Sequence, residues 1–206
     1  MRQKFFIDIH KGATFIYILS LLYIFGQWNN TTAFIYLALH GSYGILWILK
    51  SYTFPDKQWE SRCSIWYGLF IWLGLSLYWI APYIIIKHNI MAPNWCIACA
   101  VTIYIFGVFF HFTSDMQKFI QLKYKPNVLI TDGMFSSIRN INYLGELFIY
   151  FGFSILAMHW APILALVVFV LLIWIPNMIK KDKSLSKYEN FNKYKKQTNS
   201  FFPFIW

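Results

Sequence analysis

Six long apolar runs divide this chain and leave it few structures to adopt. They lie at about Gly12–Gly26, Thr31–Leu49, Ser64–Ile86, Trp95–Phe112, Tyr143–Ala157 and Ala161–Met178. Such runs predict membrane-spanning helices, because a bilayer core takes roughly 20 helical residues to cross. Several runs are short, so we expect tilt or flanking aromatic residues to make up the length. The sequence therefore predicts an all-α, polytopic membrane helix bundle of about six transmembrane helices.

The charged residues fix the orientation of these helices. With six spans, 17 of the 18 Lys and Arg residues and all eight acidic residues fall on one side, and only Lys87 falls on the other. Basic loops are retained in the cytoplasm. We therefore predict cytoplasmic N- and C-termini, an integral multi-pass protein of a bacterial inner membrane, and an active site that faces the cytoplasm.

The composition excludes other classes of protein. Charged residues make up 13% of the chain, whereas a soluble domain carries about 25%. The net charge of +10 sits in short loops and a tail beside apolar runs, which favours membrane lipids over nucleic acid as partners. Cys96 and Cys99 form a lone CxxC that opens an apolar helix. We interpret them as small packing residues and predict no metal site.

A first group of polar residues closes the fourth run. His111 and Asp115 are four residues apart and share a helix face. Ionisable side chains at membrane depth usually face a cavity or a partner. The alternative is a local His–Asp pair at a helix end, which needs no function.

A second group leads into the fifth run. Gly133 permits a tight turn, and Gly145 lets a ligand or another helix approach closely. Arg139 can pair with a phosphate through two parallel hydrogen bonds.

The same segment continues into a helix start whose face presents an amide, a phenol and a carboxylate, from Asn142, Tyr143 and Glu146. These groups suit a ribose or an adenine edge. The alternative is a helix-start cap in which Glu146 interacts with the helix dipole.

Two further groups complete the candidates. Lys181, Asp182, Tyr188 and Tyr194 in the C-terminal tail can close over an anionic cofactor, or the lysines can coat the leaflet surface. The aromatic end, which finishes at Trp206, suggests docking of the terminus.

In the second run, His40 lies mid-span with Tyr43 nearby, and Glu60 follows in the next loop. His40 is a functional candidate or a buried histidine bonded to a neighbouring helix.

These pieces, in this order, resemble the steroid 5-alpha-reductase and sterol-reductase superfamily, in particular its uncharacterised bacterial membrane branch. The matching residues are Ser114–Asp115, Gly133–Phe135, Asn142–Glu146, Lys181–Asp182, Tyr188, and Tyr194 before Phe202–Phe204. The resemblance is best from His111 to Trp206, and the Asn-Tyr-Leu-Gly-Glu stretch is its most specific part.

The resemblance implies an oxidoreductase acting on CH–CH donors. Such an enzyme uses NADPH to reduce a C=C bond in a lipophilic small molecule, such as a steroid-like, isoprenoid or other lipid. One domain, 1–206, would hold substrate-side helices in 1–110 and a cofactor-binding half in 111–206. The implied cofactor-binding residues are His111, Asp115, Arg139, Asn142, Tyr143, Glu146, Lys181, Asp182, Tyr188 and Tyr194. Our catalytic candidates, which would polarise a substrate carbonyl, are His40, Tyr43 and Glu60.

The C-terminal half is also similar to isoprenylcysteine carboxyl methyltransferases, which use S-adenosylmethionine. Those enzymes carry Arg-His-Pro before Tyr-x-Gly, whereas this chain has Arg139-Asn140-Ile141. The missing His and Pro favour the reductase, with the methyltransferase as the alternative.

Overall fold

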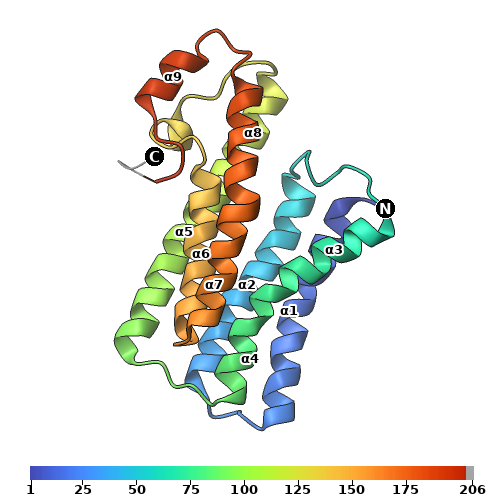
Figure 1. Cartoon of the computed structure of the whole chain (residues 1–206), viewed down its shortest axis with the longest axis vertical. Coiled ribbons are helices and arrows are strands. Elements are labelled where there is room, and N and C mark those ends of the chain that lie inside the picture. Colours follow the sequence, from blue (N-terminus) through green and yellow to red (C-terminus); the bar gives the residue numbers. More distant parts are fainter. Residues whose placement is uncertain (203–206) are drawn as a thin grey trace. The chain divides into compact units, whose positions relative to one another are not determined.

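The computed structural model describes residues 1–202, and its regular elements are helices (Figure 1). The α-helices are α1 (Gln3–Phe25), α2 (Thr31–Thr53), α3 (Ile65–Leu75), α4 (Ile80–Lys87), α5 (Asn94–Tyr124), α6 (Ile141–Leu156), α7 (Trp160–Phe169), α8 (Ile175–Leu185) and α9 (Phe191–Gln197). Shorter helical turns are η1 (Ser76–Trp79), η2 (Gly133–Phe135) and η3 (Val170–Trp174). The predicted all-α class is confirmed.

Five stretches are long and apolar enough to cross a membrane. They are Gln3–Phe25, Thr31–Thr53, Ile65–Lys87, Asn94–Tyr124 and Trp160–Leu185. The remaining predicted run forms α6, whose 16 residues extend about 24 Å at 1.5 Å per residue and fall short of a full bilayer core. The chain is therefore a polytopic helical bundle that fits an integral membrane protein.

The first helix begins at Gln3, whereas the sequence suggested Gly12. Its first turns carry polar residues that an isolated membrane helix would not tolerate. Asp8 shows why they are allowed: its carboxylate accepts hydrogen bonds from Trp47 Nε1 at 3.1 Å and from Ser51 Oγ at 2.8 Å. Polar groups that find partners on a neighbouring helix no longer need water.

The chain forms two compact units, each discontinuous in sequence. Unit 1 comprises residues 1–104 and 150–166, and unit 2 comprises residues 105–149 and 167–206. The division at residue 110 into substrate and cofactor parts stays a prediction, since α6 and α7 each contribute to both units.

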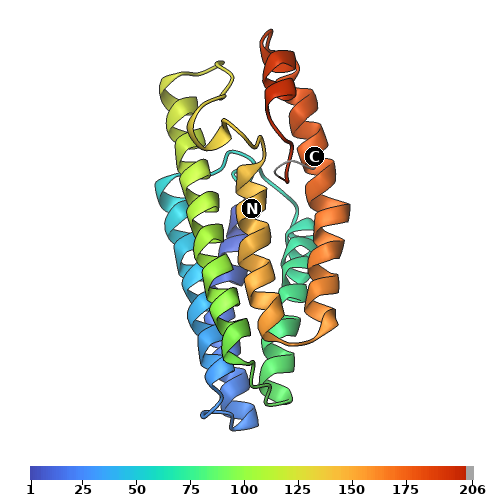
Figure 2. The ribbon, with the colours of Figure 1, turned by 90° about the vertical axis from the view of Figure 1, so that its left-hand side faces the viewer.

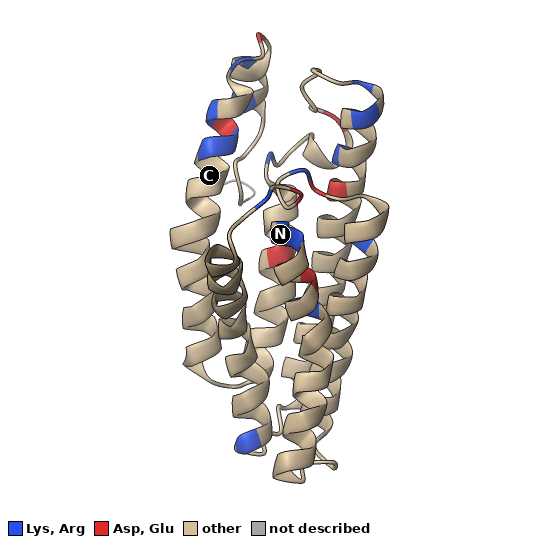
Figure 3. Ribbon diagram, turned by 90° about the vertical axis from the view of Figure 1, so that its right-hand side faces the viewer, with Lys and Arg blue, Asp and Glu red and all other residues tan. Residues whose placement is uncertain are grey.

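In unit 1, α1 packs against α2, α3 and α4, and α1 and α2 run side by side (Figures 1 and 2). At one end, Arg2 and Arg62 face each other in an antiparallel bridge. At the opposite end, the main-chain N–H of Ala92 donates to Thr32 Oγ1 at 2.8 Å. Lys87 ends α4 at this second end, and the other charged residues of the unit gather toward the first (Figure 3). The charge asymmetry of the sequence is thus present within this unit.

Pro82 lies in the first turn of α4, just after the turn η1 that interrupts the third run. Pro82 has no N–H to donate to the carbonyl four residues earlier, which belongs to Tyr78 in the turn η1. The hydroxyl of Tyr36 donates to that carbonyl at 3.3 Å. A side chain of α2 therefore satisfies the acceptor that the proline leaves open.

In unit 2, α5 and α6 approach each other closely at two glycines. A Cβ on Gly145 would lie 2.4 Å from the backbone nitrogen of His111, and one on Gly107 would lie 2.8 Å from the carbonyl oxygen of Gly145. The close neighbour expected at Gly145 is thus α5. Gly133 has φ +56° and opens the turn η2, as its sequence context predicts.

We predict that Gly145→Ala destabilises the protein by about 1–3 kcal/mol, the usual cost of overpacking, because backbone atoms of α5 cannot yield. Unfolding in detergent micelles would measure this. Gly74→Ala is the matched control: a Cβ there meets no atom of the described residues within 4 Å, so its effect should be neutral or slightly stabilising. Equal effects from the two substitutions would contradict the packing argument.

Candidate functional site

In unit 2, His111 and Asp115 lie on the face of α5 that their spacing predicts. The Nδ1 of His111, a residue only 2% exposed, is 3.2 Å from the carbonyl oxygen of Asn142. Its Nε2 is 3.8 Å from Asp115 Oδ2, and Asp115 is also buried. The structure therefore brings together three of the predicted cofactor-binding residues.

The start of α6 supplies the rest of this group. Tyr143 and Glu146 are half-buried there, and the Tyr143 ring lies with its centroid 5.8 Å from that of Trp174. The buried Asn142 Oδ1 accepts no hydrogen bond from the described residues. Such an oxygen costs about 1–3 kcal/mol when it lacks a donor, so this position suits a ligand that brings one.

Arg139 is 4% exposed and holds the C-terminal segment. Its Nη1 donates to the Thr198 carbonyl at 2.6 Å, and its Nη2 donates to Asp182 Oδ2 at 3.1 Å. Nη1 is also within 3.3 Å of the Lys195 carbonyl. The sequence suggested that Arg139 binds a phosphate, but here most of its donors serve protein acceptors.

Other bonds join the same segments. Lys181 Nζ donates to the Arg139 carbonyl at 2.8 Å, and the Asn140 amide donates to the Ser200 carbonyl at 2.9 Å. The Tyr194 hydroxyl donates to the Phe135 carbonyl at 2.7 Å.

Burial raises the pKa of Tyr194 to about 12, so the phenol stays protonated and keeps this bond at neutral pH. Tyr188 lies half-buried between α8 and α9, outside this set of contacts. The described part of the terminus is docked as predicted, while Trp206 lies outside the described residues.

A cavity of about 450 Å³ lies beside these bonds. Three cations, Arg139, Lys183 and Lys195, and the carboxylate of Asp182 contribute to its lining. Its volume is typical of ligand sites, and its net positive charge suits an anionic group.

Unit 1 contains a second buried polar centre around Lys11. Lys11 is 4% exposed, and its ammonium donates a hydrogen bond to the Tyr150 hydroxyl. The same Nζ lies 4.2 Å from the ring centroid of Tyr43 and 4.6 Å from that of Trp47. Sequence reasoning missed Lys11 and Tyr150, because the predicted first run begins at Gly12 and leaves Lys11 outside it. The available signal was an ionisable residue directly beside the first apolar run, and in the structure Lys11 lies more than two turns inside α1.

His40 and Tyr43 share this core. His40 Nδ1 is 2.8 Å from the Tyr36 hydroxyl, and its ring stacks on Phe153 with centroids 4.2 Å apart. Tyr43 also contacts Phe153, at 6.0 Å between centroids. Tyr36 lies one turn earlier on α2, so the polar partner of His40 comes from its own helix.

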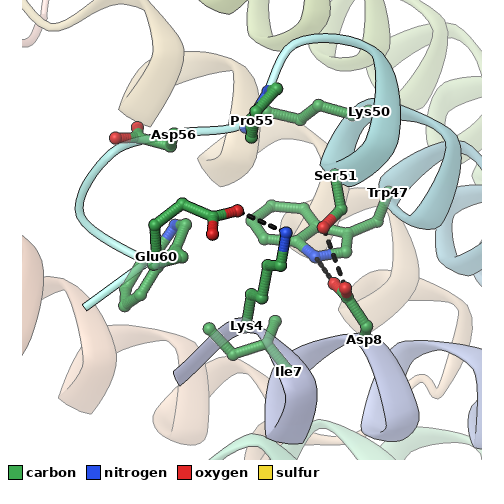
Figure 4. Close-up of a pocket in the computed structure, with 10 residues that line it drawn as sticks. Lys4, Ile7, Asp8, Trp47, Lys50, Ser51, Pro55, Asp56 and Glu60 are labelled. Atoms are coloured by element: carbon green, nitrogen blue, oxygen red, sulfur yellow. Dashed lines mark hydrogen bonds and ion pairs between the residues drawn. The ribbon is translucent and has the colours of Figure 1, made fainter. Parts of the chain in front are cut away.

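Glu60 lies at the charged end of unit 1, not beside His40 and Tyr43. It pairs with Lys4 and with Arg2 Nη1, the latter at 2.6 Å. The hydrogen bond from Lys4 is the main reason why the pKa of Glu60 is lowered. Figure 4 shows Glu60 and Lys4 with Asp8 around a cavity of about 10 Å³, which has room for about one water molecule.

These features define a class of protein, an all-helical membrane protein with two buried polar centres. The family described as "Protein of unknown function (DUF1295)" matches residues 2–198. The match covers nearly the whole chain, so the protein belongs to this family. No curated protein is a significant match.

We predict that Arg139→Met loosens the C-terminal segment, because it leaves Asp182 without its cation and two carbonyls without a donor. Breaking a buried ion pair from one side costs about 3–5 kcal/mol. Hydrogen exchange across residues 191–201 should therefore accelerate at least roughly tenfold. Lys183→Met, in the same cavity lining, is the control and should leave exchange unchanged. Protection that persists in Arg139→Met would show that the guanidinium does not hold the segment.

Proposed function

We propose that the protein is a membrane-embedded reductase that uses NADPH to reduce a C=C bond, conjugated to a carbonyl, in a lipophilic substrate. The main support is the group of His111, Asp115 and Asn142, in which the buried amide oxygen of Asn142 accepts no hydrogen bond from residues 1–202. Family membership and the resemblance of Asn142–Glu146 to steroid 5-alpha-reductases support the same conclusion.

The residues of unit 2 fit the chemistry of this cofactor. Asn142 Oδ1 can accept from a carboxamide N–H, and the carboxylates of Asp115 and Glu146 can accept from ribose hydroxyls. Lys183 and Lys195, which border the cavity beside Arg139, can face phosphates. When bound, NADPH supplies the hydride for one carbon of the double bond.

The reduction also needs a proton for the other carbon of the double bond. We assign it to Tyr150, whose hydroxyl is bonded to Lys11 in an apolar core. The Tyr150 O–H bond breaks as the proton passes to the substrate, and the Lys11 ammonium balances the phenolate that remains. An ion pair formed away from water is strongly stabilised. Solvent then restores the proton. The ring of Tyr43 contacts the Lys11 ammonium and would help to hold it in place. Glu60 has no part in this step, because it is paired with Lys4 and Arg2.

We predict that NADPH raises the thermal stability of the purified protein and that S-adenosylmethionine does not. A ligand at about 100 times its Kd adds about 2.7 kcal/mol to the folded state. Glu146→Gln should weaken the NADPH effect, and Glu189→Gln, an exposed acid outside the group, is the control. Stabilisation by S-adenosylmethionine alone would select the methyltransferase, and no response to either would reject both activities.

We further predict that Tyr150→Phe slows turnover strongly but keeps NADPH binding. Membranes that contain the protein would be incubated with NADPH deuterated at the transferred position, and deuterium in extracted lipids would be followed by mass spectrometry. Loss of the proton donor should lower the rate about 10²–10⁴-fold. Tyr23→Phe, on the exposed face of α1, should match the wild type. Normal turnover in Tyr150→Phe would remove this assignment and leave the reductase intact.

A further inference from the structure

The surface of unit 1 carries a groove between α1 and α2 that the reductase proposal does not use. The groove encloses about 770 Å³. Its lining includes Ile9, Ile16 and Ile48, and also Gly12 and Ala13, the two smallest apolar lining residues, which we call its floor. Gly12 also lets α2 approach α1 closely: a Cβ on Gly12 would lie 3.1 Å from Ile48 Cδ1.

The apolar side of the groove is long and faces outward. Phe5, Ile9 and Ile16 lie on the outer face of α1, and Ile16 is 66% exposed. In a helix long enough to span a membrane, this face meets lipid chains. The rise from Phe5 to Ile16 is about 16 Å at 1.5 Å per residue, close to half of a bilayer core of about 30 Å. The groove therefore has the length of one leaflet.

The mouth of the groove is basic and held in place. Arg2 and Lys4 line it, and the bridge between Arg2 and Arg62 is reinforced by the Gln3 N–H, which donates to the Ser61 carbonyl at 3.0 Å.

Two carboxylates also lie at the mouth. Glu60 pairs with Lys4 and with one nitrogen of Arg2, and Asp8 accepts from Trp47 and Ser51. The Arg2 side chain is nevertheless 60% exposed, and Arg62 is exposed as well. Two arginines thus remain accessible where lipid headgroups lie, and arginine pairs with phosphate through two parallel hydrogen bonds.

We propose that this groove binds one anionic phospholipid, with its phosphate at Arg2 and Arg62 and one acyl chain along the floor at Gly12 and Ala13. Charge complementarity at the mouth selects an anionic over a zwitterionic headgroup. Positive-inside orientation places this mouth at the cytoplasmic leaflet, where anionic lipids add attraction to basic residues. The site involves neither the cofactor residues nor the Lys11 centre.

Native mass spectrometry of the delipidated protein in detergent tests the headgroup. Phosphatidylglycerol and phosphatidylcholine with identical acyl chains would be titrated separately. We expect one phosphatidylglycerol to bind at least tenfold more tightly than phosphatidylcholine. The double variant Arg2→Gln/Arg62→Gln should lose about 25-fold in affinity, at about fivefold for each cation near the headgroup. Lys123→Gln/Lys125→Gln removes the same charge from exposed positions of unit 2 and should bind normally. Equal binding of the two lipids, or wild-type affinity in the arginine variant, would overturn the proposal.

A second variant and a label test the position of the chain. Ala13→Phe should fill the floor and remove the bound lipid, whereas Ala98→Phe, at an exposed position of α5, should not. Phosphatidylglycerol with a diazirine in its acyl chain should crosslink the wild type within residues 5–16 or 48–52. Crosslinks confined to other segments would overturn the proposal even if Ala13→Phe failed to fold.

Discussion

The arrangement of unit 1 depends on one constraint: a polar group inside an apolar helix bundle costs free energy unless it finds a partner. Tyr36 supplies the donor that the Tyr78 carbonyl needs because of Pro82. Lys11 lies among aromatic rings and bonds to Tyr150. In each case the partner comes from a different helix. These polar contacts therefore specify which helices are neighbours, whereas apolar packing alone is less specific.

The fold was largely predictable from hydropathy and charge, because both act over whole helices. The six runs correspond to the helical stretches, and Lys87 marks the opposite end of unit 1. The start of α1 was not predictable. Lys4, Asp8 and Lys11 argue against a membrane helix when each residue is judged alone. They are accommodated only because their partners lie on segments that are distant in sequence.

In the candidate site, too, contacts within one helix were predictable and contacts between distant segments were not. Spacing within one helix placed His111 beside Asp115, since helical periodicity is a local property. The use of Arg139 depends on Thr198 and Asp182, and no local pattern reveals that its donors are already engaged. Tyr150 looked like one aromatic residue among many. Its significance comes from Lys11, 139 positions earlier.

The hydrogen bond from Arg139 to the C-terminal segment has a consequence for biosynthesis. Its acceptor Thr198 lies 59 positions later in the chain, so a nascent polypeptide that has inserted α5 and α6 still lacks that acceptor. During this interval the guanidinium must stay hydrated at the membrane surface. Unit 2 therefore gains the contact that holds residues 191–201 only after α7, α8 and α9 have been synthesised.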